Sequence, residues 1–502
     1  MSMQRKAQGP LIMVALIGVT AMAMLLPAAV GFTLREHALA RAFLYSAALL
    51  GSLAGMIYLA ARANPSRDGA LSHPFSILTL AYLLLPALMA VPLTEAIPGM
   101  RFGDAWFEML SAFTTTGASL LEGTTSRSVD LWRATVAWGG GLFVVVCVMA
   151  LLVPFNLGGV ELLRGQIGGA MRVTEPGQAQ TNFQESDESR NLQRLRDQVS
   201  VIAPAYLGIT LVLWVGLSMA GNPPLVALML AMSTLSTSGI VPVGVSTSVP
   251  SEILIALVLV FALSRRLWPG ARALSADQSP KRQDPELMLA AVIVALIVLA
   301  LVLHALIRPG PGGFVTHLAD IWAHGFTALS FLTTTGFVSS ASGGLSQVFS
   351  GPAGLMLMGL ALFGGGVATT AGGLKLMRVF ALGWQARREV SKLVYPDSVG
   401  GDGPRLRSLR REGAFAAWLF LMIFIFALTS LTAGLTLAGL TLEKAAVFAV
   451  AALTTTGPLP LIAAAEPLYW GELGEGAKIL LGFGMLLGRL ELLLLLSVLW
   501  RR

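Results

Sequence analysis

The chain has 502 residues, of which 55% are hydrophobic and only 12% are charged. This leaves too little polar surface to cover a water-soluble globule of that size, which excludes an ordinary soluble protein. The net charge of +7 reflects basic residues that gather in the predicted cytoplasmic segments, described below, and does not indicate nucleic-acid binding. The composition therefore predicts an integral membrane protein.

Ten apolar runs approach the length of a membrane-spanning helix, because the hydrocarbon core is about 30 Å thick and a helix rises about 1.5 Å per residue. The first follows Arg5 and Lys6 without a clear cleavage pattern, so we expect it to remain as a helix. The sixth is short, and Arg489 and Glu491 interrupt the tenth. The predicted spans are 11–31, 43–61, 74–95, 133–155, 199–220, 250–263, 287–307, 350–374, 414–436 and 479–500.

Basic residues indicate the orientation of these spans, because Lys and Arg gather on the cytoplasmic side of membrane helices. With the N-terminus inside, the predicted inner segments hold 25 of the 34 Lys and Arg, and the outer segments hold 8. The sequence therefore predicts a multi-pass protein with both termini in the cytoplasm.

Four short polar segments repeat along the chain with the pattern Ser/Thr-Thr-Ser/Thr-Gly. Their glycines lie 122, 97 and 121 residues apart, which is too far for a solenoid but suits a repeated membrane hairpin. Each follows a moderately apolar stretch that is too short to cross the membrane and is expected to re-enter it. The segments are 114–117, 236–239, 333–336 and 454–457, and the stretches before them are 104–113, 224–235, 318–332 and 442–453.

These features predict an all-α membrane protein with four pseudo-symmetric repeats around a central pore. Each repeat has a helix, a re-entrant pore helix, a filter loop and a second helix. The expected division is an N-terminal hairpin (1–70), repeat 1 (71–163), a cytoplasmic loop (164–198), repeat 2 (199–265), a cytoplasmic linker (266–286), repeat 3 (287–378), a second cytoplasmic loop (379–412) and repeat 4 (413–502).

The four loops suit a cation filter. A dehydrated cation needs oxygen ligands, which rings of backbone carbonyls supply, and non-helical backbone is tolerated at membrane depth only where it lines such a cavity. Helix C-termini aimed at the loops would favour a cation further. Close packing of small residues between helices is the structural alternative for one loop, but four copies with matched flanks weigh against it. The candidate ion ligands are Thr115, Thr116, Gly117, Thr237, Ser238, Gly239, Thr334, Thr335, Gly336, Thr455, Thr456 and Gly457.

With these loops and two further motifs, the chain resembles the Trk/Ktr/HKT superfamily of potassium uptake proteins, in particular its TrkH type. The resemblance implies potassium preference from the four filter glycines. It also implies a gate loop within 363–375, expected to hold Gly364, Gly365, Gly366, Thr369, Thr370, Gly372, Gly373 and Lys375.

The second motif is Gly488-Arg489-Leu490-Glu491, similar to an element of the family whose arginine lies near the gate and limits ion passage. The carbonyls of 364–373 are the candidate partner of Arg489, and an interhelical ion pair is the alternative. For the gate loop, the structural alternative is a close contact between helices. Ile240-Val241-Pro242 departs from the family, which usually has an aromatic residue there.

The resemblance further implies uptake of potassium as the substrate, no cofactor bound by this chain, and a bacterial inner-membrane location. Membrane lipid, a second copy in a homodimer and a cytoplasmic nucleotide-binding ring of the TrkA or KtrA type are the implied partners.

Other readings stay open at this point. No nucleophile, phosphate loop or metal-ligand spacing predicts an enzyme, and Cys147 reads as a buried apolar residue. The rivals are the potassium-binding subunit of an ATP-driven pump and a gradient-coupled symporter, although the latter usually has intramembrane carboxylates. Four further side chains could serve the pore or merely pack or cap helices: His304, His324, Glu122 and Glu443.

Overall fold

The structure is a computed structural model that describes residues 8–63, 74–152, 187–268, 284–307, 314–340, 352–394 and 414–490, without positions 122, 124, 125, 243, 244 and 465. These residues form helices and connecting loops, with no β-strand among them, so the predicted all-helical class is confirmed.

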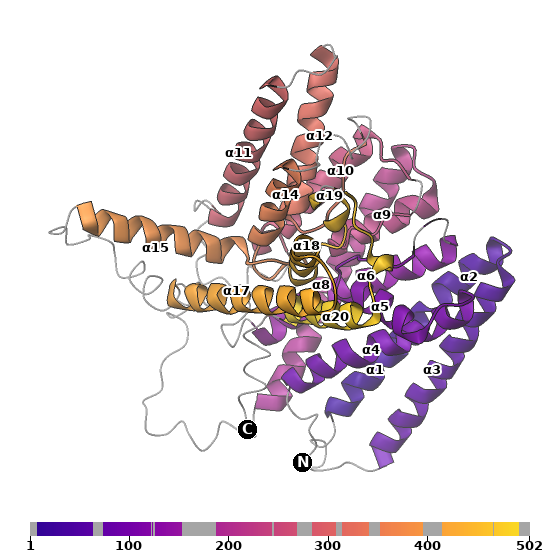
Figure 1. Ribbon diagram of the computed structural model, residues 1–502. Coiled ribbons are helices and arrows are strands. Elements are labelled where there is room, and N and C mark those ends of the chain that lie inside the picture. The colour runs from indigo at the N-terminus through magenta and orange to yellow at the C-terminus, as the bar shows by residue number, and fades with distance from the viewer. Residues whose placement is uncertain are drawn as a thin grey trace, which may run out of the picture.

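An N-terminal helical hairpin precedes the repeats. Helix α1 (Gln8–Ala23) and α2 (Leu25–Thr33) form one nearly continuous run that packs along α3 (His37–Ala63). The turn before α3 contains Arg35 in the left-handed region, with a φ of 63°. In Figure 1 this hairpin lies beside α4 at one side of the molecule, where α1 and α3 both contact α4.

Four units with the same order of helices follow the hairpin. Each has a long helix, a short helix that ends at a filter loop, and a second helix after the loop. The long helices are α4 (Pro74–Ala96), α8 (Asp187–Met219), α11 (Pro285–Ile307) and α17 (Ala414–Leu437). The short helices are α5 (Phe102–Phe113), α9 (Pro224–Ser236), α12 (Phe314–Leu332) and α18 (Leu442–Leu453). The second helices are α6 (Arg127–Cys147), α10 (Val249–Leu259), α14 (Pro352–Phe363) and α20 (Glu475–Leu490).

Short irregular helices extend two of these second helices or lie after the filters. A π-helix, η1 (Val148–Leu152), extends α6, and the 3₁₀-helices η3 (Val260–Ala262) and η4 (Arg265–Leu267) follow α10. After the fourth filter come α19 (Pro460–Ala463) and η7 (Trp470–Glu472).

The units close into a ring through their helix contacts. Each short helix packs against the long helix of its own unit and also against the second helix of the preceding unit: α6 contacts α9, α10 contacts α12, and α14 contacts α18. The fourth unit returns to the first, because α20 contacts α5. The short helices therefore stand around one centre, with α18 near the middle of the view in Figure 1.

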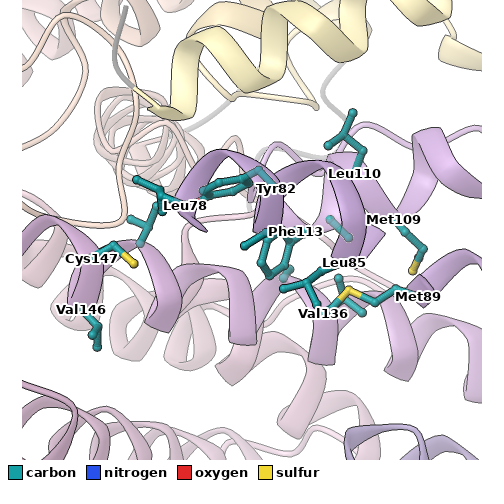
Figure 2. Packing of buried hydrophobic residues seen from close by; sticks show 14 of the residues in the cluster. Leu78, Tyr82, Leu85, Met89, Met109, Leu110, Phe113, Val136, Val146 and Cys147 are labelled. Atoms are coloured by element: carbon teal, nitrogen blue, oxygen red, sulfur yellow. The ribbon is translucent and has the colours of Figure 1, made fainter. Parts of the chain in front are cut away.

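An aromatic and aliphatic core holds the first unit together. The Tyr82 ring of α4 lies 5.1 Å from Phe113 of α5 and 5.5 Å from Phe143 of α6. Figure 2 shows side chains of the three helices meeting there, with Cys147 among apolar neighbours. Between membrane helices such rings stabilise the fold by close van der Waals packing rather than by removal from water, and this packing fixes the short helix that ends at the first filter.

Six helical segments within the described residues are long and apolar enough to cross a membrane: Leu11–Thr33, His37–Arg62, Ile77–Ala96, Arg127–Ala150, Gln193–Met219 and Ala414–Leu437. Large apolar side chains such as Val212 and Met219 remain exposed on them, as is typical of surfaces that face lipid. The other four predicted spans coincide with α10, α11, α14 and the described part of α20.

One predicted span ends early, and two predicted cytoplasmic loops contain helical residues. Helix α14 ends at Phe363, well before the predicted end of the span 350–374, because the glycine-rich loop begins there. Helix α15 (Leu376–Val394) occupies part of the predicted loop 379–412, and α8 begins at Asp187 inside the predicted loop 164–198. A few apolar side chains of these stretches pack against the core, namely Ala381 and Leu382 of α15 and Leu195 of α8. Residues 164–186, most of the linker 266–286, the remainder of 379–412, and Glu491 lie outside the described residues.

Candidate ion pathway

The four filter loops share one backbone conformation. The second residue of each is a threonine in the left-handed region: φ is 55° at Thr115, 54° at Thr237, 57° at Thr334 and 54° at Thr455. Glycine is the usual residue where a helix ends in this way, and a side chain there costs about 1–2 kcal/mol. Four threonines at such positions indicate that the side chain itself has a role.

Backbone hydrogen bonds explain this conformation. In the first loop, the Thr116 N–H donates to the Ser111 carbonyl at 2.8 Å and the Thr115 N–H donates to the Ala112 carbonyl at 2.9 Å. This pair of bonds closes the C-terminus of a helix around one left-handed residue. The third residue of the other loops donates in the same way, with distances of 3.0 Å (Ser238 to Ser233), 2.9 Å (Thr335 to Ser330) and 2.9 Å (Thr456 to Ala451).

The first and third hydroxyls of each loop pair with each other. The distances between their oxygens are 2.9 Å for Thr114 and Thr116, 3.1 Å for Ser236 and Ser238, 3.0 Å for Thr333 and Thr335, and 3.1 Å for Thr454 and Thr456. Either Ser or Thr can make this bond, which accounts for the variation at these two positions. The second position is threonine in all four loops and does not take part.

The hydroxyls at the second position have different surroundings. Within the described part of the chain, the Thr115 and Thr455 hydroxyls are buried without a hydrogen-bond partner. The Thr237 hydroxyl donates to the Ser236 carbonyl at 2.7 Å, and the Thr334 oxygen accepts from the Gly372 N–H at 2.7 Å. Two oxygens are thus available as ligands, and a third is bonded to the predicted gate loop.

The filter glycines bring neighbouring loops into contact. A Cβ at Gly117 would lie 1.8 Å from the Ser238 oxygen, and one at Gly239 would lie 2.0 Å from the Thr335 oxygen. Both sites, like Gly336, have positive φ values, of 74°, 66° and 81° in chain order. No side chain fits there without moving the next loop, so glycine is required both for its φ and for the close approach.

The fourth filter differs from the other three. Gly457 has no positive φ and precedes Pro458, whose ring lies 2.9 Å from the Cβ positions of both Gly239 and Gly336. The Gly457 N–H donates to the Thr116 carbonyl at 2.6 Å, and its oxygen accepts from Trp470 Nε1 at 2.9 Å. A proline restricts the residue before it to extended conformations, which explains the departure from fourfold symmetry.

The predicted gate loop joins α14 to α15 and lies directly against two filters. Besides the Gly372 bond to Thr334, a Cβ at Gly372 would lie 2.2 Å from the Thr454 oxygen. Its glycines are therefore sites of close backbone approach: a Cβ at Gly366 would lie 2.3 Å from the Leu263 oxygen, and one at Gly364 would lie 2.2 Å from the Gly372 oxygen.

A backbone carbonyl of the second unit and a side chain of the third unit hold this loop. The Thr369 hydroxyl and the Gly366 N–H both bond the Ala262 carbonyl at 2.9 Å, and the Val367 N–H donates to Glu286 Oε1 at 3.0 Å. Sequence reasoning missed Glu286. Its position in the first turn of α11 gives no signal that it contacts a loop 81 residues later.

Two buried cationic side chains meet the loop carbonyls. Arg489 Nη1 donates to the Thr370 oxygen at 2.5 Å, and Lys375 Nζ donates to the Ala371 oxygen. Both line a small cavity between the loop, α17 and α20, together with Thr369 and Gly373. The structure thus brings a guanidinium and an ammonium beside the loop that touches the filters.

The remaining candidates lie apart from this centre or outside the description. His324 is buried in α12 with its Nδ1 against the Asp320 carbonyl, and Glu443 is exposed. Glu122 and the His304 side chain are not among the described groups. Sequence reasoning also missed the positions of two buried carboxylates near the filters, Glu108 and Glu252.

The chain is similar to known potassium uptake proteins. No family model matches the chain. It is 27% identical to the Trk system potassium uptake protein TrkH of Vibrio parahaemolyticus over 452 residues, covering 87% of this chain and 86% of the relative. Identity to TrkH of Escherichia coli is 25% over 491 residues, or 94% of each chain.

A solved structure shares the fold. The crystal structure of the potassium transporter TrkH from Vibrio parahaemolyticus superimposes with a TM-score of 0.77 over 98% of this chain and 97% of that chain, at 24% sequence identity. The chain is therefore a relative of the Trk system potassium uptake proteins and has the TrkH fold.

Proposed function

We propose that this chain takes up potassium across the bacterial inner membrane through a pore lined by the four filter loops. The observation that carries the proposal is the ring of four left-handed threonines, each two residues before a glycine that touches another filter loop. The names of the relatives support potassium as the ion. Transport requires no cofactor from this chain, and we assign it no enzymatic step.

The ligands of the ion are hydroxyl and carbonyl oxygens of the filters. Thr115 and Thr455 offer hydroxyl oxygens that no protein donor occupies, and the loop carbonyls add the oxygens that replace the hydration shell. The C-termini of α5, α9, α12 and α18 end at the loops, so their partial negative charges favour a cation at the centre. The selective element is neutral and preorganised.

The loop 364–375 closes the pathway on the other side of these threonines. In the closed arrangement Gly372 is bonded to Thr334, and Arg489 holds the Thr370 carbonyl. A cation leaving the filter meets two fixed positive charges, Lys375 and Arg489. Opening breaks these bonds and moves the loop aside, which frees the Thr334 hydroxyl as a third ligand.

The proposed organisation follows the contact ring. The four pore units occupy 71–163, 199–265, 287–378 and 413–502 after the hairpin 1–70, with cytoplasmic segments between them. The bias of basic residues supports cytoplasmic termini. We further propose that the chain forms a homodimer and that a cytoplasmic nucleotide-binding ring of the TrkA or KtrA type moves the gate.

Rubidium-86 uptake into proteoliposomes tests the proposal, with potassium or sodium as competitor. Wild-type protein should take up rubidium, and potassium should block uptake much better than sodium. Gly117→Ser should weaken this discrimination because its Cβ displaces the Ser238 carbonyl. Gly139→Ser, at an open position in helix α6, is the matched control.

Absence of flux in the wild type, even with a regulatory ring present, would contradict the proposal. Equal discrimination in Gly117→Ser and wild type would contradict the assigned filter.

A further inference from the structure

A buried carboxylate stands behind the third filter. Glu252 lies in the first turn of α10, and its side chain is completely buried. Its Oε1 accepts from the Thr247 hydroxyl at 3.0 Å and the Ser340 N–H at 2.9 Å. Its Oε2 accepts from Trp322 Nε1 at 2.8 Å and the Ser339 hydroxyl at 2.7 Å. Four donors thus converge on one side chain.

These donors come from three places around the pore. Thr247 lies in the segment after the second filter, Trp322 lies in the pore helix α12, and Ser339 and Ser340 follow the third filter. Ser339 is three residues beyond Gly336, so their Cα atoms are at most about 11 Å apart. Glu252 therefore joins units 2 and 3 at the level where the chain leaves the third filter.

A buried glutamate also lies behind the first filter, but it forms an ion pair with an arginine. Glu108 Oε2 accepts from the Leu120 N–H at 2.8 Å, three residues beyond Gly117, but its Oε1 pairs with Arg133 Nε at 2.5 Å. Among the described residues, no Lys, Arg or His side chain forms an ion pair with Glu252. Within the described part of the chain, the carboxyl group behind the third filter thus has hydrogen-bond donors but no cationic partner.

The donors also explain why glutamine cannot replace this glutamate. Ser340 N–H on one oxygen and Trp322 Nε1 on the other can only donate, so the amide NH₂ of glutamine would face a donor in either orientation. A buried donor without an acceptor is costly. Changing Trp322 to Phe removes one of these donors, and the amide could then donate to the Ser339 hydroxyl oxygen.

We propose that Glu252 is a positioning residue with two separable effects: its four hydrogen bonds hold the exit of the third filter in its selective geometry, and its charge raises cation occupancy at that end of the pore. The proposal rests on the function proposed above. The hydrogen bonds govern discrimination between ions, and the charge governs the concentration at which uptake is half-maximal.

Three variants separate the two effects in rubidium-86 uptake: Glu252→Gln, Trp322→Phe and the double variant. Glu252→Gln should lose potassium-over-sodium discrimination and raise the half-saturating rubidium concentration about fivefold. The double variant should regain most of the discrimination, because its hydrogen bonds are again satisfied, but should keep the raised half-saturating concentration. Trp322→Phe should keep the wild-type half-saturating concentration.

Failure of the proposed function would appear as no rubidium flux in the wild type, so it can be told apart from failure of the role assigned to Glu252. Wild-type behaviour of Glu252→Gln overturns the proposal, and discrimination in the double variant no better than in Glu252→Gln overturns the positioning role. If Glu252→Gln does not fold, the double variant and Trp322→Phe still differ in charge. Equal half-saturating concentrations in that pair overturn the electrostatic role.

Discussion

The filter loops and the gate loop both use glycine for close backbone approach, but the filters occur in four copies and the gate loop in one. The filters place the same left-handed threonine conformation around one centre, and in the proposed function every copy contributes to a shared ion site. The loop 364–375 occurs once, and its glycines let its backbone press against Leu263 and Thr454. Coordination of a cation needs ligands on all sides, whereas one obstruction is enough to close a pore. In the proposed function the four filters therefore select the ion and the single loop blocks its passage.

The largest effect is expected from a substitution in one of the filters. Gly239→Ala places a Cβ about where the Thr335 oxygen lies, at a residue with a φ of 66°. We expect rubidium uptake to fall at least about tenfold, because both the strain and the clash fall on the filter. Gly139→Ala, in open space on a helix, should keep wild-type flux. Flux retained in Gly239→Ala would show that the loops do not line the pathway.

The next largest effect is expected from a substitution that weakens the proposed gate. Arg489→Gln deletes a buried positive charge beside the Thr370 carbonyl, and we expect resting uptake without the regulatory ring to rise about tenfold. The exposed Arg387→Gln on α15 is the matched control for loss of one positive charge. Unchanged resting uptake in Arg489→Gln would place the barrier elsewhere.

A smaller effect is expected from loss of the hydrogen bond between the third filter and the gate loop. Thr334→Val leaves the Gly372 N–H without its acceptor, at a cost of about 1–3 kcal/mol to the closed loop. Thr115→Val removes an equivalent hydroxyl that bonds no part of the loop. Resting uptake should therefore be higher, by about fivefold, in Thr334→Val than in Thr115→Val. Equal values would mean that the bond does not hold the gate.

The smallest effect concerns the seam between the last and first units. Lys478 Nζ lies 2.5 Å from Asp104 Oδ1 at a partly exposed position. We expect Asp104→Asn to lower stability by less than about 1 kcal/mol, measured by thermal unfolding in detergent, with no change in ion discrimination. A large loss of stability would show that the ion pair, rather than the apolar packing of α5 on α20, closes the ring.

The sequence located the filters because their signal is local and repeated. The pattern at 114–117 and its three copies predicts both the short helix before each loop and its end. It does not reveal that the first and third hydroxyls pair, or that Pro458 changes the backbone of the fourth loop. Those features depend on turn geometry, which a composition pattern leaves open.

Contacts over long separations could not be predicted in the same way. The Glu252 bond to Ser340 spans 88 residues, and neither end carries a distinguishing neighbour in the sequence. The contact of Arg489 with a carbonyl of 364–373, across 119 residues, was anticipated only because two motifs resembled those of a known family. The helix α15 was concealed for a different reason. Its many charged residues hide an apolar side that continues from the buried start at Leu376.

The contact of α20 with α5 bears on how the chain is made. These helices join the last unit to the first, and the ion pair between them links residues 374 positions apart. When only the first three units have been synthesised, the ring of helices is therefore incomplete and does not enclose the proposed pathway. The ring closes only when the final unit is inserted, by which time residues 364–375 and most of the cytoplasmic segments have already been made. If the loop 364–375 is the gate, as proposed, it is thus made before the wall of the pore can close.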